Sequence, residues 1–598
     1  LVDIYRSPAD SINQSFDLYS RKAAFLLSNG SVVGLDGASP VSMAVSNLNE
    51  FHVGISHRNH LSVISSASLS NGPGVCYYDF TTSAEKAIGG TAVLKQLSLG
   101  KWCMIAADGD GNNQVDNRDK NAVWFMEVQS EGYLNGDFNM DGIVDILDIS
   151  TKWALNAGQG SNDSKDVLKV CDENGRYFCR GGEAVYFTGS HTWDNLQDLG
   201  DVAFNYEDYL DWMSDFNHNF MRLWAWETPH GTDWAKNDDN DISPVPYKKA
   251  GSQYDVTQLN EAYFERLRQR ILAADDRGIY VAIMLFQGFS VEHTPYAWDF
   301  HPFKSGNNVN GMAIPRYEVH TNLHTDALQA QKLYVREVID IVNYYNLNNV
   351  LYEIGNEIDY SPESDQWQND MIDYIHNYEF QTYGVNRPVG KTYQNSGGNN
   401  DVLFNSPADW ISPRDQGGFD CREGDAPISG GDKVIISDTD HFYYIWYNNS
   451  NEYSVDFVWK SFTGGIHAIH MDNWGGGDNL PGRLHGSTYA YYFQRIRDNM
   501  GWATQLAKRM DLTSTTPQPD LSSTGFCLAS ETEFVVYLPK GVTSVTLDMT
   551  AVSGQFAVEW LDTDTGIITT AQHVGGGNMA NFSNADPDAQ VLYLYKID

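Results

Sequence analysis

The sequence predicts a multidomain fold centred on a (β/α)8, or TIM, barrel. Between residues 169 and 512, short apolar runs alternate with amphipathic helical patterns, which is typical of βα units that close a parallel barrel. Short alternating strands are predicted on both sides of this region, and two acidic loops begin 137 − 108 = 29 residues apart on its N-terminal side. The predicted divisions are a β-rich module at 1–100, a double-loop domain at 101–157, a linker at 158–168, the barrel at 169–512 and a β-sandwich at 518–598.

The excess of acidic residues makes some classes of binding partner improbable. The chain of 598 residues has 39 basic and 78 acidic residues, a formal net charge of −39. Such a surface repels nucleic acids and anionic membranes as a whole, so we expect neither as a partner, although a local basic cleft stays open. No apolar run approaches the roughly 20 residues that span a bilayer.

Cysteine use and the N-terminus favour a secreted, periplasmic or cell-surface protein. No leader segment precedes Leu1, and we expect a signal peptide to have been removed. Six cysteines do not make a disulfide scaffold in so long a chain. Cys171 and Cys179 flank a turn and could form a bridge, whereas the other four are predicted to be buried thiols: Cys76, Cys103, Cys421 and Cys527.

The two acidic loops have the spacing of a calcium-binding motif. Oxygen side chains occur at loop positions 1, 3, 5, 9 and 12, and position 7 can offer its backbone carbonyl. The first loop contains Asp108, Asp110, Asn112, Gln114, Asp116 and Asp119, and the second contains Asp137, Asn139, Asp141, Ile143, Asp145 and Asp148. Gly142 provides the sharp turn at position 6 of the second loop, and Asn113 takes this place in the first.

This pair of loops resembles a dockerin, in which position 12 is Asp rather than the Glu of the usual EF-hand. The resemblance implies one or two structural Ca²⁺ ions and leaves a cohesin-type partner open. Because the pair lies between other predicted domains, we favour a calcium-stiffened spacer over a docking module. No catalytic cofactor is expected.

The barrel strands can be proposed in order along the chain. They are Val185–Thr188, Phe220–Trp224, Tyr280–Phe286, Asn349–Glu357, Pro388–Tyr393, Asp409–Ser412, Lys433–Ser437 and Ile466–Met471. Amphipathic helices are predicted at 259–277 and 328–345, with apolar residues at spacings of three and four. In such a barrel, the residues just after the C-terminal ends of the strands carry the chemistry.

The fourth strand ends in Gly355-Asn356-Glu357 after an apolar run. This ending resembles the acid/base signature of the cellulase-like (clan A) retaining glycoside hydrolases, with the apiosidase-like and putative-cellulase branch the closest. The resemblance covers the barrel and implies that Glu357 is the acid/base residue and that Asn356 contacts a sugar hydroxyl. It also implies a nucleophile at the end of strand seven.

Strand seven departs from the pattern of that family. The family usually has Thr-Glu or Ser-Glu here, but this chain has Ser437-Asp438, followed by Asp440. We take Asp438 as the first candidate nucleophile and Asp440 as the second. Carboxyl groups about 5 to 5.5 Å apart would indicate a retaining enzyme, and a wider pair an inverting one. Glu227 is a substrate contact or a substitute catalytic carboxylate, and Glu353 is predicted to pair with Arg222 inside the barrel.

Several other side chains at strand ends could bind sugar, which needs flat apolar surfaces and polar edges. The candidate substrate contacts are Asn356, His191, Trp193, Arg222, Trp226, Glu227, Gln287, His441, Asp472 and Trp474. Among the tryptophans, Trp226 and Trp474 are the favoured stacking platforms.

The resemblance implies a secreted enzyme that cleaves O-glycosidic bonds of an environmental polysaccharide or oligosaccharide, and the acidic composition suggests a marine source and a sulfated substrate. A sulfated substrate would need a cation in the cleft, and Arg222, Lys391 and Arg414 are the candidates. The alternative is a non-catalytic carbohydrate-binding or adhesion protein on a barrel scaffold, which the carboxylates at both strand ends disfavour.

Overall fold

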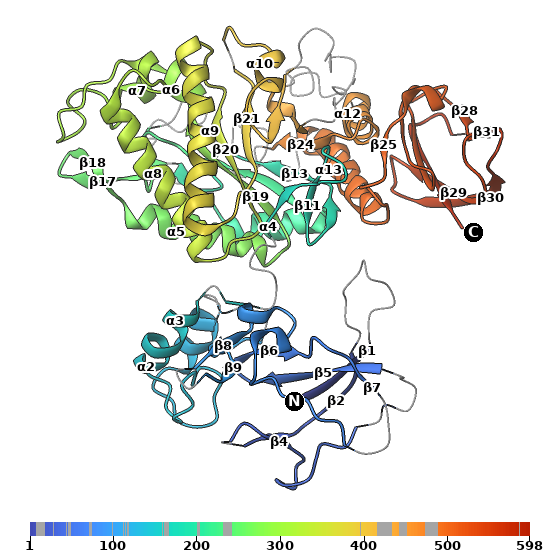
Figure 1. Cartoon of the computed structure of the whole chain (residues 1–598). Coiled ribbons are helices and arrows are strands. Elements are labelled where there is room, and N and C mark those ends of the chain that lie inside the picture. The colour runs from blue at the N-terminus through green and yellow to red at the C-terminus, as the bar shows by residue number, and fades with distance from the viewer. Residues whose placement is uncertain are drawn as a thin grey trace. The chain divides into compact units, whose positions relative to one another are not determined.

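The computed structural model divides the chain into two compact units, one formed by Leu1–Asp166 with Tyr344–Asn346 and the other by Val167–Asn343 with Leu347–Asp598 (Figure 1). The division falls inside the predicted linker. The structure describes residues 1–6, 18–27, 29–43, 45, 50–70, 75–97, 100–111, 113, 115, 119–157, 159–160, 167–199, 204–230, 242–394, 396–414, 433–441, 451–472, 488–584 and 586–597. Among these residues, no helix is long and apolar enough to cross a lipid bilayer.

The first unit begins with an antiparallel sheet, as its alternating pattern predicts. Its strand order is β2-β1-β5-β6, with β7 beside β5. The strands are β1 (Val2–Arg6), β2 (Leu18–Lys22), β5 (Glu50–His57), β6 (His60–Ile64) and β7 (Leu69–Ser70). Two short ladders accompany the sheet: β3 (Phe25–Leu26) with β4 (Val32–Val33), and β8 (Leu94–Gln96) with β9 (Trp102–Met104).

Each acidic loop of the first unit leads into a helical segment. The first loop is followed by a π-helical turn at Asp119–Trp124 and α1 (Phe125–Glu127), and the second by α2 (Ile146–Asp148), a π-helical turn at Ile149–Trp153 and α3 (Ala154–Asn156). Leu61 of β6, Phe138 of the second loop and Trp153 lie in one apolar cluster. The loops and the sheet therefore share a core.

The second unit contains the predicted parallel barrel, whose eight strands pair in the order β13-β24-β23-β22-β21-β20-β19-β15. The strands are β13 (Thr188–His191), β15 (Phe220–Leu223), β19 (Tyr280–Gln287), β20 (Val350–Asn356), β21 (Val389–Thr392), β22 (Trp410–Ser412), β23 (Val434–Asp438) and β24 (His467–Met471). Figure 1 shows β19, β20, β21 and β24 at the centre of this unit.

The barrel is nearly closed, and side-chain amides bridge the seam between β13 and β15. The backbone N–H of Asn219 donates to the carbonyl of Thr188 at 3.0 Å, and its side-chain oxygen accepts the N–H of Thr188 at 3.0 Å. Further along, the amide of Asn195 pairs with the carbonyl of Arg222 at 2.7 Å and the N–H of Trp224 at 2.8 Å. These amides act as strand partners where the backbones do not pair.

The position predicted for the first barrel strand is wrong by about three residues. Val185 pairs with Phe178 in an antiparallel hairpin, and the barrel strand is the polar run Thr188–His191 that follows. All four of its residues are buried. Gly189 is required here, because a Cβ would lie 1.7 Å from the carbonyl oxygen of Phe220. Its lack of apolar residues hid this strand from the sequence pattern.

The helices cover the outside of the barrel, and both predicted helices are confirmed as α5 and α8. The helices are α4 (Tyr206–Asp215), α5 (Glu261–Asp275), α6 (Gly288–His293), α7 (Pro295–Asp299), α8 (Thr325–Tyr344), α9 (Pro362–Tyr383), α10 (Asn400–Phe404), α12 (Asn451–Thr463) and α13 (Thr488–Ala507). A capping box in which Ser361 and Ser364 exchange hydrogen bonds fixes the start of α9.

A small antiparallel sheet closes the end of the barrel at which its strands begin. Its strands are β10 (Lys169–Val170), β11 (Phe178–Arg180) and β12 (Glu183–Val185). Leu168 and Phe178 pack in one cluster with residues near the starts of the barrel strands, among them Phe220 and Val434. In a barrel of this kind a functional site is expected at the opposite end, where the strands finish.

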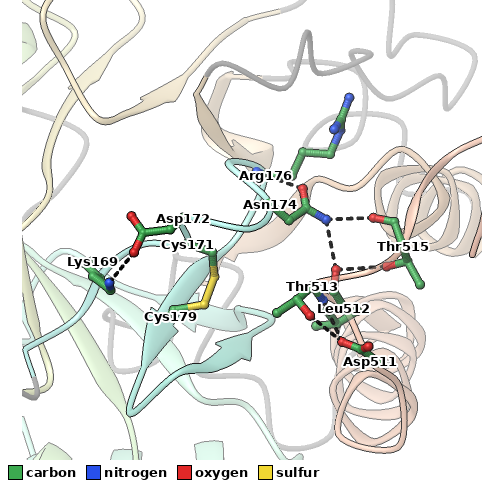
Figure 2. The surroundings of a disulfide bond; sticks show 10 residues. All are labelled: Lys169, Cys171, Asp172, Asn174, Arg176, Cys179, Asp511, Leu512, Thr513 and Thr515. Atoms are coloured by element: carbon green, nitrogen blue, oxygen red, sulfur yellow. Dashed lines mark hydrogen bonds and ion pairs between the residues drawn. A yellow bond between two sulfur atoms is a disulfide. The ribbon is translucent and has the colours of Figure 1, made fainter. Parts of the chain in front are cut away.

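The predicted disulfide between Cys171 and Cys179 is confirmed. It closes the β10–β11 hairpin, and Asn174 in the same hairpin donates to the carbonyls of Leu512 at 2.9 Å and Thr515 at 2.7 Å (Figure 2). The hairpin is thus tied to the segment after α13.

The prediction that the other four cysteines are buried thiols is only partly right. Cys527 is buried, but Cys103 is half-buried and Cys76 is exposed. Cys421 lies outside the described residues.

The C-terminal region is built from β-strands and packs against helices of the barrel. A six-stranded sheet has the order β25-β26-β27-β32-β29-β30, and β28 pairs with β31. The strands are β25 (Thr516–Pro517), β26 (Cys527–Ala529), β27 (Glu533–Leu538), β28 (Ser544–Asp548), β29 (Gln555–Asp562), β30 (Ile568–Gly575), β31 (Met579–Ser583) and β32 (Gln590–Lys596). Val535 and Tyr593 share a buried cluster with Trp459 of α12 and Met500 of α13. The sandwich classification stays a prediction.

Candidate active site

Glu357 is the first residue after β20 and lies at the C-terminal end of the barrel. It is half-buried and has a positive φ of 50°, which is unusual for a residue with a side chain and costs roughly 1–3 kcal/mol. Gly355, two residues earlier, lets β20 lie close to β19, since a Cβ there would lie 2.9 Å from the carbonyl oxygen of Phe286. Strain held in this way is typical of functional sites and suggests that the direction of the Glu357 side chain matters.

Arg222, on β15, connects the carboxylates of strands four and seven. Its Nε and Nη2 donate to both oxygens of Glu353, at 2.9 and 2.5 Å, which confirms the predicted pair. Nη1 donates to Oδ2 of Asp438 at 2.9 Å, and Nη2 also donates to Oδ1 of Asn356 at 2.7 Å. Burial alone would lower the pKa of Arg222, but the charges of Glu353 and Asp438 outweigh it and raise that pKa.

Asp438 ends β23 and is completely buried. Its Oδ2 lies 2.9 Å from Nη1 of Arg222 and 2.8 Å from Nε2 of His191, and its Oδ1 accepts the backbone N–H of Asp440 at 3.0 Å. Both oxygens therefore have partners, and the carboxylate has no exposed surface. Asp438 orients the strand end at which Asp440 is placed.

The carboxyl groups of Asp440 and Glu357 both have raised pKa values. Burial and the charge of Asp438 raise the pKa of Asp440 to about 6, although Arg222 and His191 oppose this rise. Burial and then the charge of Asp440 raise the pKa of Glu357 well above its usual range, and Asp440 affects it more than Asp438 does. Asp440 is also half-buried rather than enclosed. Two carboxyl groups whose pKa values are pushed apart can serve as acid and base at the same pH.

The structure contradicts the prediction that Trp226 is an exposed stacking platform. Its side chain is 0% exposed and its indole N–H donates to the carbonyl of Trp193 at 2.7 Å. Gln197 holds the backbone of Trp226 through both its N–H and its carbonyl, at 2.7 and 3.1 Å. This extra pairing turns the segment after β15 inward. Trp193 is also buried, and Trp474 lies outside the described residues.

Several other side chains that were predicted to contact substrate instead bind other residues of the protein. Asp472, after β24, is completely buried and forms a bidentate pair with Arg497 of α13, at 2.7 Å for each oxygen, so it cannot contact substrate as predicted. Gln287 is buried and caps α6, because its Oε1 accepts the backbone N–H of Ser290 at 3.4 Å. His191 is buried against Asp438, and the side chain of His441 is outside the described residues.

Glu227 belongs to a buried array that sequence patterns did not reveal. Its Oε2 accepts the backbone N–H of Gln287 at 2.8 Å and lies 3.1 Å from Nε2 of His320. Nδ1 of His320 lies 3.4 Å from Oε1 of Glu292, whose Oε2 accepts the backbone N–H of Asp359 at 2.7 Å. Asp359 is two residues after Glu357, so this array holds the strand-four turn.

The charges in this array are fixed by mutual pairing. Burial would raise the pKa of Glu227, but His320 and His301 lower it to about 2, and burial would lower the pKa of His320, but Glu227 and Glu292 raise it to about 9. Glu227 thus remains ionised and is a poor proton donor. His301 and His320 lie in the irregular segment before α8, where no periodicity marks them.

We expect His320→Gln to lower the free energy of unfolding by roughly 3 kcal/mol below pH 6.5, because it leaves two buried carboxylates without their cation. Because folding raises the pKa of His320, protonated His320 stabilises the fold fully at pH values below about 6.5, the ordinary pKa of histidine. This contribution disappears as the pH rises through about 9. Urea unfolding at pH 6 and pH 10 measures it. The half-exposed pair of His324 with Glu318 provides the control, and His324→Gln should cost under about 1 kcal/mol. A pH-independent loss in His320→Gln would contradict the assignment.

In the first unit, the predicted calcium loops bring carboxylates together. Ligand oxygens of Asp108, Asp110 and Asp119 all lie within 4.8 Å of one another. Asn113 has φ of 65° and Gly142 has φ of 90°, as the two turns require. Asn112, Gln114 and Asp116 lie outside the described residues.

In the second loop, backbone N–H groups occupy the carboxylates. Asp137 accepts the N–H groups of Asp141 and Gly142, and Asp148 accepts those of Asn139 and Asp145. Ile143 donates its own N–H to Asp141. Burial and the charges of Asp137 and Asp141 raise the pKa of Asp148. This concentration of negative charge fits a hard cation, which would offset it.

Comparison with known proteins supports the barrel. No family model matches the sequence, and no curated protein matches it. The solved structures that match in three dimensions include two that each cover 72% of this chain: a glycoside hydrolase at 14% identity and TM-score 0.50, and a family 5 glycoside hydrolase from Bacteroides vulgatus at 13% identity and TM-score 0.51. They are covered over 97% and 94% of their own lengths. The fold is that of glycoside hydrolase barrels. At this identity the likeness extends to the fold alone, and the function depends on the side chains at the strand ends.

Proposed function

We propose that this protein is a retaining glycoside hydrolase with Glu357 as acid/base residue and Asp440 as nucleophile. The observation that carries the proposal is the pair of half-buried carboxyl groups with raised pKa values after strands four and seven. The likeness to glycoside hydrolase barrels supports it. Asp440 is a better candidate nucleophile than Asp438, because Asp438 is completely buried and both of its oxygens have partners.

In the first step, Glu357 donates its proton to the glycosidic oxygen while the Asp440 carboxylate attacks the anomeric carbon, so the C–O bond to the leaving group breaks as an ester to Asp440 forms. In the second step, ionised Glu357 removes a proton from water, which displaces Asp440 from the sugar. Asp438 positions Asp440 through its backbone N–H, and Arg222 keeps Asp438 and Asn356 in place.

The test of the function is hydrolysis by the wild-type protein of a panel of plant, algal and bacterial polysaccharides, followed by reducing-end release and product analysis. Cleavage of at least one glycan supports the proposal. Binding without cleavage of any member would overturn it in favour of the carbohydrate-binding alternative.

The pKa values predict how the rate depends on pH. The nucleophile must be ionised, so we expect kcat/KM to rise with pH and with an apparent pKa of about 6, which is the raised pKa of Asp440. The acid must be protonated, so the rate should fall again at higher pH, above the ordinary range of a glutamate. Initial rates from pH 4 to pH 10 measure both limbs. A profile that rises at pH 4 and stays flat would contradict the assignment.

We further propose that the two acidic loops bind structural Ca²⁺ and that the protein is secreted. The gathered oxygens of Asp108, Asp110 and Asp119 support the first part, and the Cys171–Cys179 disulfide supports the second, since such bonds persist in oxidising compartments. Oxygen side chains of both loops would hold the ions, whose role is to offset the charge of the loops.

Removal of calcium is expected to destabilise the first unit. Ligand at 100 times its Kd stabilises a fold by about 2.7 kcal/mol, so EGTA should lower the transition of this unit by several degrees, and added Ca²⁺ should restore it. Calorimetry together with elemental analysis measures this effect. Asp108→Asn should reduce the bound calcium, whereas an unchanged melting curve without bound calcium would exclude the sites.

A further inference from the structure

Arg414 is a cation at the catalytic end of the barrel. It follows β22, two residues after Ser412, and is half-buried. The side chain of Asn400 fixes its backbone from both sides: the Asn400 amide donates to the Arg414 carbonyl at 2.8 Å, and its oxygen accepts the Arg414 N–H at 3.1 Å. The guanidinium lies over the ring of Tyr393, 4.3 Å from its centroid. Asn400 and Tyr393 therefore hold Arg414 in place without supplying a negative charge.

The positive charge of Arg414 has no carboxylate partner among the described residues, in which its guanidinium makes no hydrogen bond or ion pair. The two other candidate cations are committed. Arg222 is buried on Glu353, Asp438 and Asn356. Lys391 is buried, and its Nζ donates to Asp365 at 2.5 Å and Asn369 at 3.0 Å. The chain has twice as many acidic as basic residues, so an arginine that has no acidic partner in the described part of the chain is unusual.

Arg414 also lies near the reacting groups. Its charge lowers the pKa of Glu357, against the rise that burial and Asp440 cause. Tyr393, which supports the guanidinium, follows strand β21, and its N–H donates to the carbonyl of Ser412 at 2.9 Å. Arg414 thus follows strand six at the same end of the barrel at which strand four places Glu357, and strand five lies between these two strands.

We propose that Arg414 binds a carboxylate or sulfate group on a sugar next to the scissile bond, so that the substrate is an anionic glycan. This inference rests on the proposed glycosidase function and names its substrate class. Guanidinium presents a planar fork of N–H donors that matches both oxyanions, and its desolvated pairs are strong. The net charge of −39 does not forbid such a ligand, because charges beyond about 8 Å are screened at 0.15 M salt, whereas a contact at Arg414 is within that distance.

The experiment compares charged oligosaccharides with matched neutral forms. Oligogalacturonides, oligoglucuronans and sulfated galactan and fucan oligosaccharides are offered beside their methyl-esterified, carboxyl-reduced or desulfated counterparts. Binding by calorimetry and hydrolysis are measured for wild type, Arg414→Gln and Arg414→Lys. Arg336→Gln on α8 is the control, since Arg336 is exposed on an outer helix. Comparison of the carboxylate and sulfate pairs identifies the source of the charge.

We expect wild type to bind at least one charged member roughly tenfold to a hundredfold more tightly than its neutral form. Arg414→Gln should abolish this preference, Arg414→Lys should keep part of it, and Arg336→Gln should keep all of it. The preference should also weaken as salt increases.

The outcomes separate this inference from the glycosidase proposal. Equal binding of charged and neutral forms, or a preference that survives in Arg414→Gln, would overturn the role of Arg414. Hydrolysis of neutral glycans only would overturn the anionic substrate and leave the glycosidase function standing. A charge preference without any hydrolysis would overturn the glycosidase function alone, and absence of both would overturn the two together.

Discussion

Replacement of Glu357 by glutamine is expected to reduce kcat on natural glycans by about 100-fold to 10,000-fold, the usual contribution of a positioned general acid. Glutamine keeps the size of the side chain but cannot donate the proton. An aryl glycoside with a good leaving group needs no such proton, so its first step should be affected much less. Kinetics with both kinds of substrate measure the difference.

The fold should tolerate this substitution. The pKa of Glu357 is raised in the folded state, so ionised Glu357 reduces stability as the pH rises above its ordinary value. Glu357→Gln should therefore melt at the same temperature as wild type or higher, and Glu363→Gln, an exposed change on α9, should leave activity unchanged. Equal loss on both kinds of substrate, or a destabilised protein, would argue against an acid/base role.

Replacement of Arg222 by methionine should have the largest effect on stability, a loss of roughly 3–5 kcal/mol, because Glu353 and Asp438 would remain buried without their cation. Urea unfolding measures this loss. In the variant, the two carboxyl pKa values should rise, so its stability should fall further as the pH increases from 5 to 8. Activity should disappear as well, since Asp438 no longer orients the end of strand seven.

Two further variants make this result specific. Arg266→Met breaks a partly exposed pair with Asp198 and should cost within about 1 kcal/mol. Arg222→Met combined with Glu353→Met should recover part of the lost stability, because one buried charge is then removed. A loss below 1 kcal/mol in Arg222→Met would show that the cluster does not need its arginine.

The sequence was sufficient for the elements with a strong apolar signal. The run at Val350–Asn356 and the period of α8 predicted a parallel strand and a covering helix, and both are present. Glu357 was found because it follows such a run directly. The first barrel strand was predicted at the wrong place, because the observed strand Thr188–His191 is polar. Its burial depends on the elements around it and not on its own composition.

Side-chain directions after the strands could not be predicted in the same way. Trp226 turns inward because Gln197, distant along the chain, pairs with its backbone. Asp438 and Asp440 have the same residue type and nearly the same position, and only the contacts of Arg222 and His191 distinguish them. His320 lies in an irregular segment, where no pattern marks a buried charge.

The central claim is that Asp440 and Glu357 form the catalytic pair. Trapping with an activated 2-deoxy-2-fluoro glycoside of the released sugar, followed by peptide mass spectrometry, tests it most directly. We expect one glycosyl group per protein, attached to Asp440. Attachment to Asp438 or another residue, or the absence of an adduct with an enzyme that inverts the anomeric centre, would contradict it.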